Sequence, residues 1–290
     1  MLWNKAKRSE NVNDQRKDKD VRSPTGKILA AGLVASVLGI SATFWADIEK
    51  AFGPEAAVIA KVQTEAAIQH QLQIHDDPHR FFVESILGSS EEVWTELFAQ
   101  QGKQYQPPAL VLFDEKVATG CGPQRPNEMG LFYCPEDKTI YINLETLGEV
   151  AVQSSTVSDF AQAYAIIHEV GHHIQNETGV LTRLEQAQAQ GQKYPGADGL
   201  SVRLELQADC LAGVWAHHAQ ERFKWLEPGD IDEALTAASM VGDDYLMRKA
   251  NNTVNPKEFA HGTSEQRIKW FNTGFNDAEG DCRTFDGAQL

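Results

Sequence analysis

AQAYAIIHEVGH, residues 161–172, is an apolar run that ends in the pattern H-E-x-x-H. We expect this stretch to lie in a buried helix over residues 158–177. Residues four apart share one face of a helix, so His168 and His172 can direct both imidazoles at one metal ion. Glu169 would then lie beside that ion, where a carboxylate can accept a proton from water. The stretch therefore predicts a metal site on a helix.

The apolar surroundings of this motif favour a functional site over a chance match. The pattern should arise by chance in about one chain in a hundred of this length, so the motif alone is not decisive. A buried glutamate between histidines would be costly without a metal or another partner. We expect Zn²⁺ rather than Mn²⁺ or Co²⁺, because two histidines, one carboxylate ligand and a helix-borne base favour zinc.

A catalytic metal site of this kind needs a third protein ligand and an open position. The metzincin extension of the motif is absent, since Gln175 and Thr178 stand where a Gly and a His are required. Downstream, Glu205 and Asp209 lie four residues apart on a second predicted helix and therefore share a face. We expect Glu205 to ligate and Asp209 to accept the spare N–H of His168. The alternative is that Asp209 ligates instead.

The rest of the pattern predicts an α+β domain, dominated by helices, over residues 80–290. A short apolar run flanked by prolines and two further runs joined by a turn-like tetrad favour a small sheet that contains a β-hairpin. We expect helices near residues 81–98, 200–220, 230–250 and 264–275, and strands near 109–114, 131–134 and 139–144.

The beginning of the chain predicts a membrane anchor. Residues 1–27 are polar and basic, so we expect a disordered cytoplasmic tail. Residues 28–46 form an uncharged run that would span roughly 28 Å as a helix, close to a bilayer core. The positive-inside rule then places residues 47–79, a spacer, and the catalytic domain outside the cytoplasmic membrane, in the periplasm. A cleaved signal peptide and a buried soluble helix are the rival interpretations.

The cysteines suit an exported domain, because all four follow the apolar run and none precedes it. Sequence alone allows three pairings of four cysteines. Cys121 and Cys134 bracket a loop rich in Pro and Gly, which favours a local disulfide there. A disulfide between Cys210 and Cys282 then follows by elimination.

The charge of the chain argues against nucleic acid as a partner. The formal net charge is −15, and residues 1–27 hold eight basic and four acidic residues. The remainder holds 18 basic and 37 acidic residues, a net charge of −19. Such a surface repels phosphates.

A set of stretches in order covers most of residues 80–285: RFFVESILGSSEEVW, GLFYCPEDKTIYI, HEVGHHIQ, LELQADCLAGVWA, HGTSEQRIKWF and the final Cys282. Together they resemble the YpfJ-like family of neutral zinc metallopeptidases. The resemblance implies an α+β zincin fold of the gluzincin type, a zinc ion and a protein or peptide substrate. It also implies that a strand of the hairpin is the edge along which a peptide aligns.

One further histidine is a candidate for stabilising the developing oxyanion. His261 resembles a downstream histidine of HtpX-like peptidases, and Arg267 stands in the place of the arginine that follows it there. A loop or cap role for His261 is the alternative. We treat His261 as a second catalytic candidate beside Glu169.

The leading hypothesis is a membrane-anchored zinc metallopeptidase that hydrolyses peptide bonds with zinc-activated water. The alternative is a non-enzymatic, membrane-anchored scaffold that keeps zinc for stability. A third possibility is a zinc hydrolase of another bond, such as a cell-wall amide. Glu169 favours an enzyme, because a structural zinc site has no need of an unligated carboxylate beside the metal.

Overall fold

The computed structural model describes residues 1–16, 50–51, 53–54, 77–124, 130–153, 159–277, 281–286 and 290, without the side chains of residues 150–153. The chain divides into two units: one combines Met1–Gln15 with Phe81–Leu290, and the other is Arg16–Arg80. The expected anchor at residues 28–46 lies outside the described residues, as does most of the spacer. No helix in the described parts of the chain combines the length and apolar character needed to cross a membrane.

A four-stranded mixed sheet lies on one side of the first unit, in the order β1-β2-β4-β3. Strand β1 (Val12–Asp14) pairs in parallel with β2 (Ala109–Leu112), and β2 pairs in parallel with β4 (Thr139–Ile142). Strand β3 (Leu131–Cys134) is antiparallel to β4 and forms the edge of the described sheet. The expected β-hairpin is therefore present.

Strand β1 corrects the expectation of a disordered tail for residues 1–16. These residues form a 3₁₀ turn, η1 (Trp3–Lys5), and then add β1 to the sheet beside β2. The sequence gives little sign of this strand, because three residues of mixed polarity carry no alternation long enough to detect. Backbone pairing with an existing sheet supplies the order that local propensity does not.

Helices make up most of the unit. The pattern over residues 230–250 is broken into two helices at Gly242, and the helices at α5 and α7 were not expected. The bounds are α4 Pro78–Gln100, α5 Leu144–Gln153, α6 Asp159–Glu177, α7 Val180–Ala189, α8 Leu200–Phe223, α9 Asp230–Met240, α10 Asp243–Lys249, η2 Pro256–Glu258 and α11 Ser264–Asn276.

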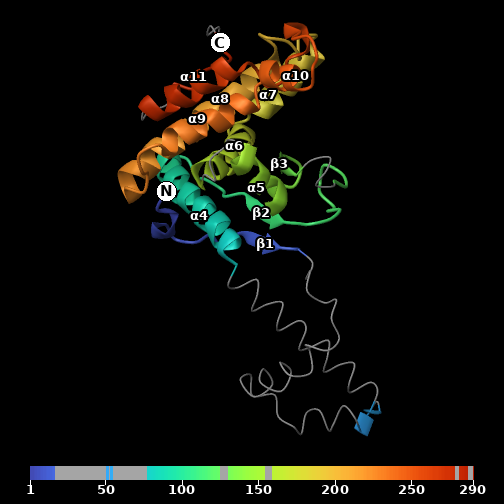
Figure 1. Ribbon diagram of the computed structural model, residues 1–290, viewed down its shortest axis with the longest axis vertical. Coiled ribbons are helices and arrows are strands. Elements are labelled where there is room, and N and C mark those ends of the chain that lie inside the picture. The colour runs from blue at the N-terminus through green and yellow to red at the C-terminus, as the bar shows by residue number, and fades with distance from the viewer. Residues whose placement is uncertain are drawn as a thin grey trace. The chain divides into compact units, whose positions relative to one another are not determined.

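Helix α6 lies in the core between β3 and the helices α8 and α9. It contacts β3 on one side and α8 and α9 on the other, while α8 and α11 lie side by side (Figure 1). Gly171 permits the close approach of α6 to α8, because a Cβ there would lie 2.9 Å from Ala208 Cα. Both helices that carry the predicted ligands are thus held rigidly against each other.

Two disulfides join the cysteines in the expected pairs. Cys121, in the loop that precedes β3, bonds to Cys134, the last residue of β3. Cys210, in the middle of α8, bonds to Cys282 in the C-terminal segment. Disulfides persist in oxidising compartments, so this pairing indicates an extracytoplasmic domain.

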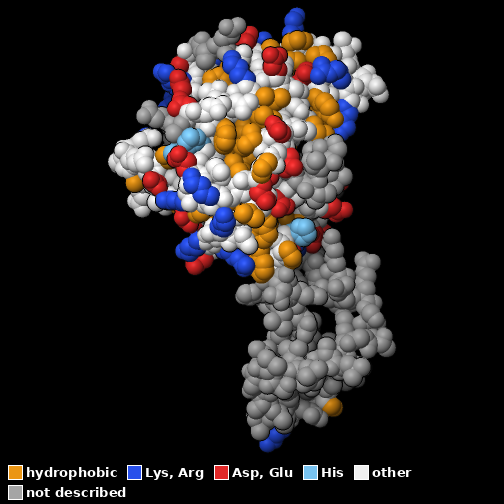
Figure 2. Space-filling model, turned by 60° about the vertical axis from the view of Figure 1, so that its left-hand side comes forward, with side chains coloured by type: hydrophobic (Ala, Val, Ile, Leu, Met, Phe, Trp, Pro, Cys, Tyr) orange, Lys and Arg blue, Asp and Glu red, His pale blue; other side chains and the backbone are white. Residues whose placement is uncertain are grey.

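On the face shown in Figure 2, acidic and basic side chains are interspersed with small apolar areas.

Candidate metal centre

His168, His172 and Glu205 bring their ligand atoms within 4.8 Å of one another. His168 Nε2 lies 3.1 Å from Glu205 Oε2, and His172 Nε2 lies 3.5 Å from Glu205 Oε1. Two ligands that each sit about 2.0–2.1 Å from a tetrahedral zinc ion are roughly 3.3–3.4 Å apart. The two contacts of Glu205 have nearly this spacing, so the donor set suits a zinc ion.

Asp209 does not join this cluster but holds His168 from the other side. Its Oδ1 accepts a hydrogen bond from His168 Nδ1 at 2.8 Å, and the carboxylate is fully buried. This contact fixes the tautomer of His168 and leaves Nε2 free to face a metal. The structure thus places Asp209 against His168 and Glu205 beside both histidines.

A buried arginine and a tyrosine complete the support of Asp209. Arg267, on α11, donates from Nε to Asp209 Oδ2 and from a terminal nitrogen to Oδ1, each at 2.8 Å. Tyr164, one turn before His168, donates to Asp209 Oδ1 at 2.5 Å. Arg267 is only 3% exposed, so this bidentate pair is shielded from water.

Gln175 supports the second histidine, His172, a role that its sequence position alone does not predict. Its Oε1 accepts a hydrogen bond from His172 Nδ1 at 2.9 Å, and its amide donates to the carbonyl of Leu204 on α8. The amide of Gln175 therefore orients His172 and ties α6 to α8 at the metal centre. The available signal was a glutamine three residues after a ligand in an otherwise apolar helix.

The charges at the centre are strongly coupled in the metal-free chain. Burial alone would lower the pKa of His168, but the carboxylates of Asp209 and Glu205 raise it to about 10. Burial would raise the pKa of Glu205, yet His172 and His168 hold it well below its ordinary value. His168 is therefore protonated in the metal-free chain, and it must lose this proton before the three side chains can bind a cation.

Glu169 lies next to the first ligand and is half-buried on α6. Within the described part of the chain, no hydrogen bond or ion pair engages its carboxylate. The side chain is therefore available to a water or a substrate beside the metal centre.

His261 lies in the loop between η2 and α11, and Asp243 at the start of α10 organises that loop. Asp243 Oδ2 accepts from the backbone N–H groups of Ala260, His261 and Gly262, while Oδ1 accepts from His261 Nδ1 at 3.0 Å. This hydrogen bond raises the pKa of His261, and the nearby charge of Glu205 raises it further.

The same loop packs against α8 near the metal centre. A Cβ on Gly262 would lie 3.1 Å from Val202, about one turn before Glu205, and 3.3 Å from Leu206, directly after it. His261 is thus brought to the side of the centre, with its imidazole about half exposed.

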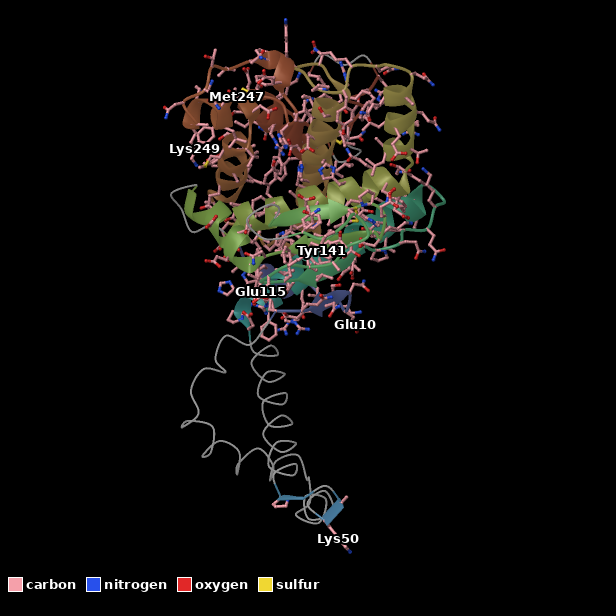
Figure 3. All side chains as sticks on the ribbon, turned by 90° about the vertical axis from the view of Figure 1, so that its right-hand side faces the viewer. Glu10, Lys50, Glu115, Tyr141, Met247 and Lys249 are labelled. Atoms are coloured by element: carbon pink, nitrogen blue, oxygen red, sulfur yellow. A yellow bond between two sulfur atoms is a disulfide. The ribbon has the colours of Figure 1, made fainter. Side chains whose placement is uncertain are left out.

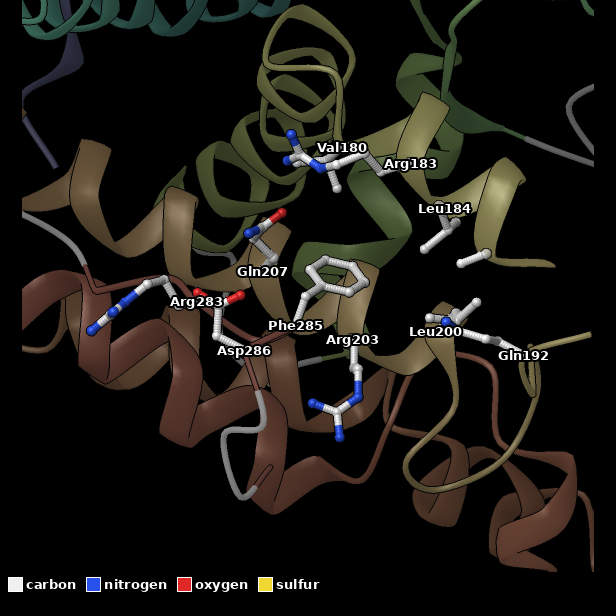
Figure 4. A pocket seen from close by; sticks show the side chains of 11 residues that line it. Val180, Arg183, Leu184, Gln192, Leu200, Arg203, Gln207, Arg283, Phe285 and Asp286 are labelled. Atoms are coloured by element: carbon white, nitrogen blue, oxygen red, sulfur yellow. The ribbon is translucent and has the colours of Figure 1, made fainter. Parts of the chain in front are cut away.

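A separate cavity of about 590 Å³ lies between α7, the start of α8 and the C-terminal segment (Figure 4). Arg203 and Gln207 line it from α8, and Phe285 lies among its lining side chains. Residues two apart on a helix point in nearly opposite directions, so Arg203 and Gln207 face away from Glu205. This cavity is therefore distinct from the metal centre.

His168 and His172 on α6 and Glu205 on α8 form a cluster with the donor set of a zinc site. Residues 1–285 of the chain match the model of the family described as "Putative neutral zinc metallopeptidase". The chain belongs to this family, as the resemblance in its sequence indicated.

Relatives match over most of their length. "Uncharacterized protein YpfJ" of Escherichia coli (strain K12) is 36% identical over 298 residues, which cover 98% of this chain and 99% of the relative. "Uncharacterized protein Rv2575" of Mycobacterium tuberculosis (strain ATCC 25618 / H37Rv) is 42% identical over 213 residues, 70% of this chain and 69% of the relative. No solved structure matches this chain.

Proposed function

We propose that this protein is a zinc metallopeptidase of an oxidising, extracytoplasmic compartment, with His168, His172 and Glu205 as ligands. The observation that carries the proposal is the convergence of these three side chains beside an unengaged Glu169. A scaffold that used zinc for stability alone would gain nothing from this carboxylate, which favours an enzyme. The two disulfides support the compartment.

The roles of the residues follow from their positions. A bound zinc ion supplies a Lewis acid that polarises a peptide carbonyl and acidifies water. Glu169 accepts the proton of the attacking water and delivers it to the leaving amine. Asp209 and Gln175 keep the two imidazoles turned toward the ion. His261 donates a hydrogen bond to the oxygen that becomes negatively charged.

Strand β3 would align the substrate. It lies at the edge of the described sheet and contacts α6, the helix that carries the motif. Its Tyr133 is fixed on α6 by hydrogen bonds from Asn176 at 2.8 Å and with His173 at 3.1 Å. An extended peptide could therefore pair with the backbone of β3 and pass the metal centre.

Zinc content after substitution of each acidic residue tests the ligand assignment. Asp209→Ala removes an orienting contact and should weaken zinc binding about 10–100-fold. Glu205→Ala removes a ligand, so we expect a larger loss of zinc and loss of peptide cleavage. The measurement is zinc per folded chain at a series of buffered zinc concentrations. Greater zinc loss in Asp209→Ala would contradict the assignment.

The pH dependence of kcat/KM tests the role of His261. Because Nδ1 of His261 donates to Asp243, Nε2 carries a proton only in the imidazolium form. The pKa of His261 is raised, so this donor persists to higher pH than for an ordinary histidine and is lost as pH rises through the folded pKa. Asp243→Asn should therefore shift the alkaline limb of the profile to lower pH. His261→Ala should remove the limb, and a limb unchanged in both variants would contradict the role.

A further inference from the structure

The first fifteen residues belong to the same unit as the metal centre. Strand β1 pairs with β2 in parallel, with Val12 opposite Leu110 and Asp14 opposite Leu112. Directly after β1, the backbone N–H of Gln15 donates to the carbonyl of Leu112 at 2.8 Å. We refer to residues 1–15 as the arm.

The contacts of the arm spread over several elements of the unit. Trp3 Nε1 donates to Asp159 at the start of α6 at 3.2 Å, and its ring packs edge-on against Phe82 of α4. Ser9 is buried and donates to Glu91 Oε1 at 2.6 Å, and Asn11 donates to the same oxygen at 2.8 Å. The guanidinium of Arg8 lies 3.6 Å from the centre of the Phe81 ring.

Gly88 in α4 allows the backbone of the arm to approach this helix closely. The backbone of the arm crosses α4 at Gly88, where an added Cβ would lie 2.0 Å from the carbonyl oxygen of Lys7 and 2.9 Å from the N–H of Ser9. Glycine inside a helix is less favourable than alanine. Gly88 therefore lowers the stability of α4 but permits the close approach of the arm. The match to the family model begins at residue 1 and so includes the arm.

From these contacts we infer that the arm and the metal centre occupy the same compartment. A strand can pair with β2 only on the side of a membrane where β2 lies. The apolar run at residues 28–46 stands between the two. A single pass of this run through a membrane would separate the arm from β2, so the contacts of the arm exclude a topology with residues 1–15 in the cytoplasm and the metal centre outside.

Thiol labelling tests this inference with the full chain. All four native cysteines are paired in disulfides, so one introduced cysteine reports its own location. Glu10→Cys places a thiol on the arm at an exposed position beside β1 (Figure 3), and Gln104→Cys places one on the surface of the metal-centre unit. Each variant is expressed in a Gram-negative host, and spheroplasts are treated with a membrane-impermeant maleimide before and after lysis.

We expect both thiols to be labelled in intact spheroplasts to the same extent as after lysis. Labelling of Gln104→Cys in intact spheroplasts, with Glu10→Cys labelled only after lysis, would overturn the inference. Labelling of both only after lysis would support the shared compartment and contradict the extracytoplasmic location proposed above. The two proposals can therefore fail separately.

Substitution of the crossing glycine tests the docking itself. Gly88→Ala should expel the arm and speed tryptic cleavage after Arg8 by about tenfold or more, because proteolysis follows the population of the open form. Gly148→Ala is the matched control, since this helical glycine in α5 has nothing within 4 Å of an added Cβ. Equal cleavage rates in both variants and the wild type would overturn the docked arm.

Discussion

Glu169→Gln is expected to lower kcat/KM for peptide hydrolysis by about 10²–10⁴-fold while one zinc per chain is retained. Glutamine keeps the size of the side chain but cannot accept a proton, so the attacking water loses its base. The three ligands are unchanged by this substitution, and no described residue depends on Glu169 for a hydrogen bond. The measurement is cleavage of an unfolded protein substrate beside zinc content.

Glu177→Gln is the matched control on the same helix. Glu177 is the last residue of α6 and pairs with Lys138 at 2.7 Å, away from the ligand cluster. Its substitution should leave both zinc and cleavage close to the wild-type level. Cleavage in Glu169→Gln at the rate of this control would show that another group is the base.

Arg267→Met is expected to reduce the free energy of unfolding by about 3–5 kcal/mol. The substitution leaves Asp209 charged, buried and without its bidentate partner, while Tyr164 and His168 on α6 remain hydrogen-bonded to it. Burial alone would raise the pKa of Asp209, and Arg267 is the largest influence that holds it below its ordinary value. Denaturant unfolding with the disulfides intact measures the loss.

The double variant separates a lost charge pair from lost packing. Asp209→Asn combined with Arg267→Met removes both charges, so part of the stability lost in Arg267→Met should return. The double variant should still bind zinc more weakly than the wild type, because an amide orients His168 less strongly than a carboxylate. A double variant less stable than the sum of the two single changes would contradict this account of the buried pair.

Much of the metal centre could be predicted because its geometry is local to two helices. The spacing of His168 and His172, and that of Glu205 and Asp209, each fixes a shared helix face without knowledge of the fold. The contact between the two helices could only be inferred from chemistry. Gln175 escaped prediction because its partners, His172 and Leu204, require the packing of α6 on α8 to be known.

The parts that could not be predicted depend on long-range contacts. Strand β1 is three residues long and gains its order from β2, nearly a hundred residues later in the chain. The chain breaks between α9 and α10 at Gly242 and Asp243. The carboxylate of Asp243 accepts a hydrogen bond from the backbone of the loop at His261. Local periodicity over residues 230–250 carries no information about that loop.

Zinc titration of the metal-free full chain, followed by cleavage of an unfolded protein, tests the central claim most directly. Chelation should abolish cleavage, and activity should return in proportion to added zinc until one ion is bound per chain. Binding of one zinc ion per chain without cleavage would contradict a peptidase and favour a zinc-containing scaffold. Failure of the folded chain to bind zinc would contradict the metal centre itself.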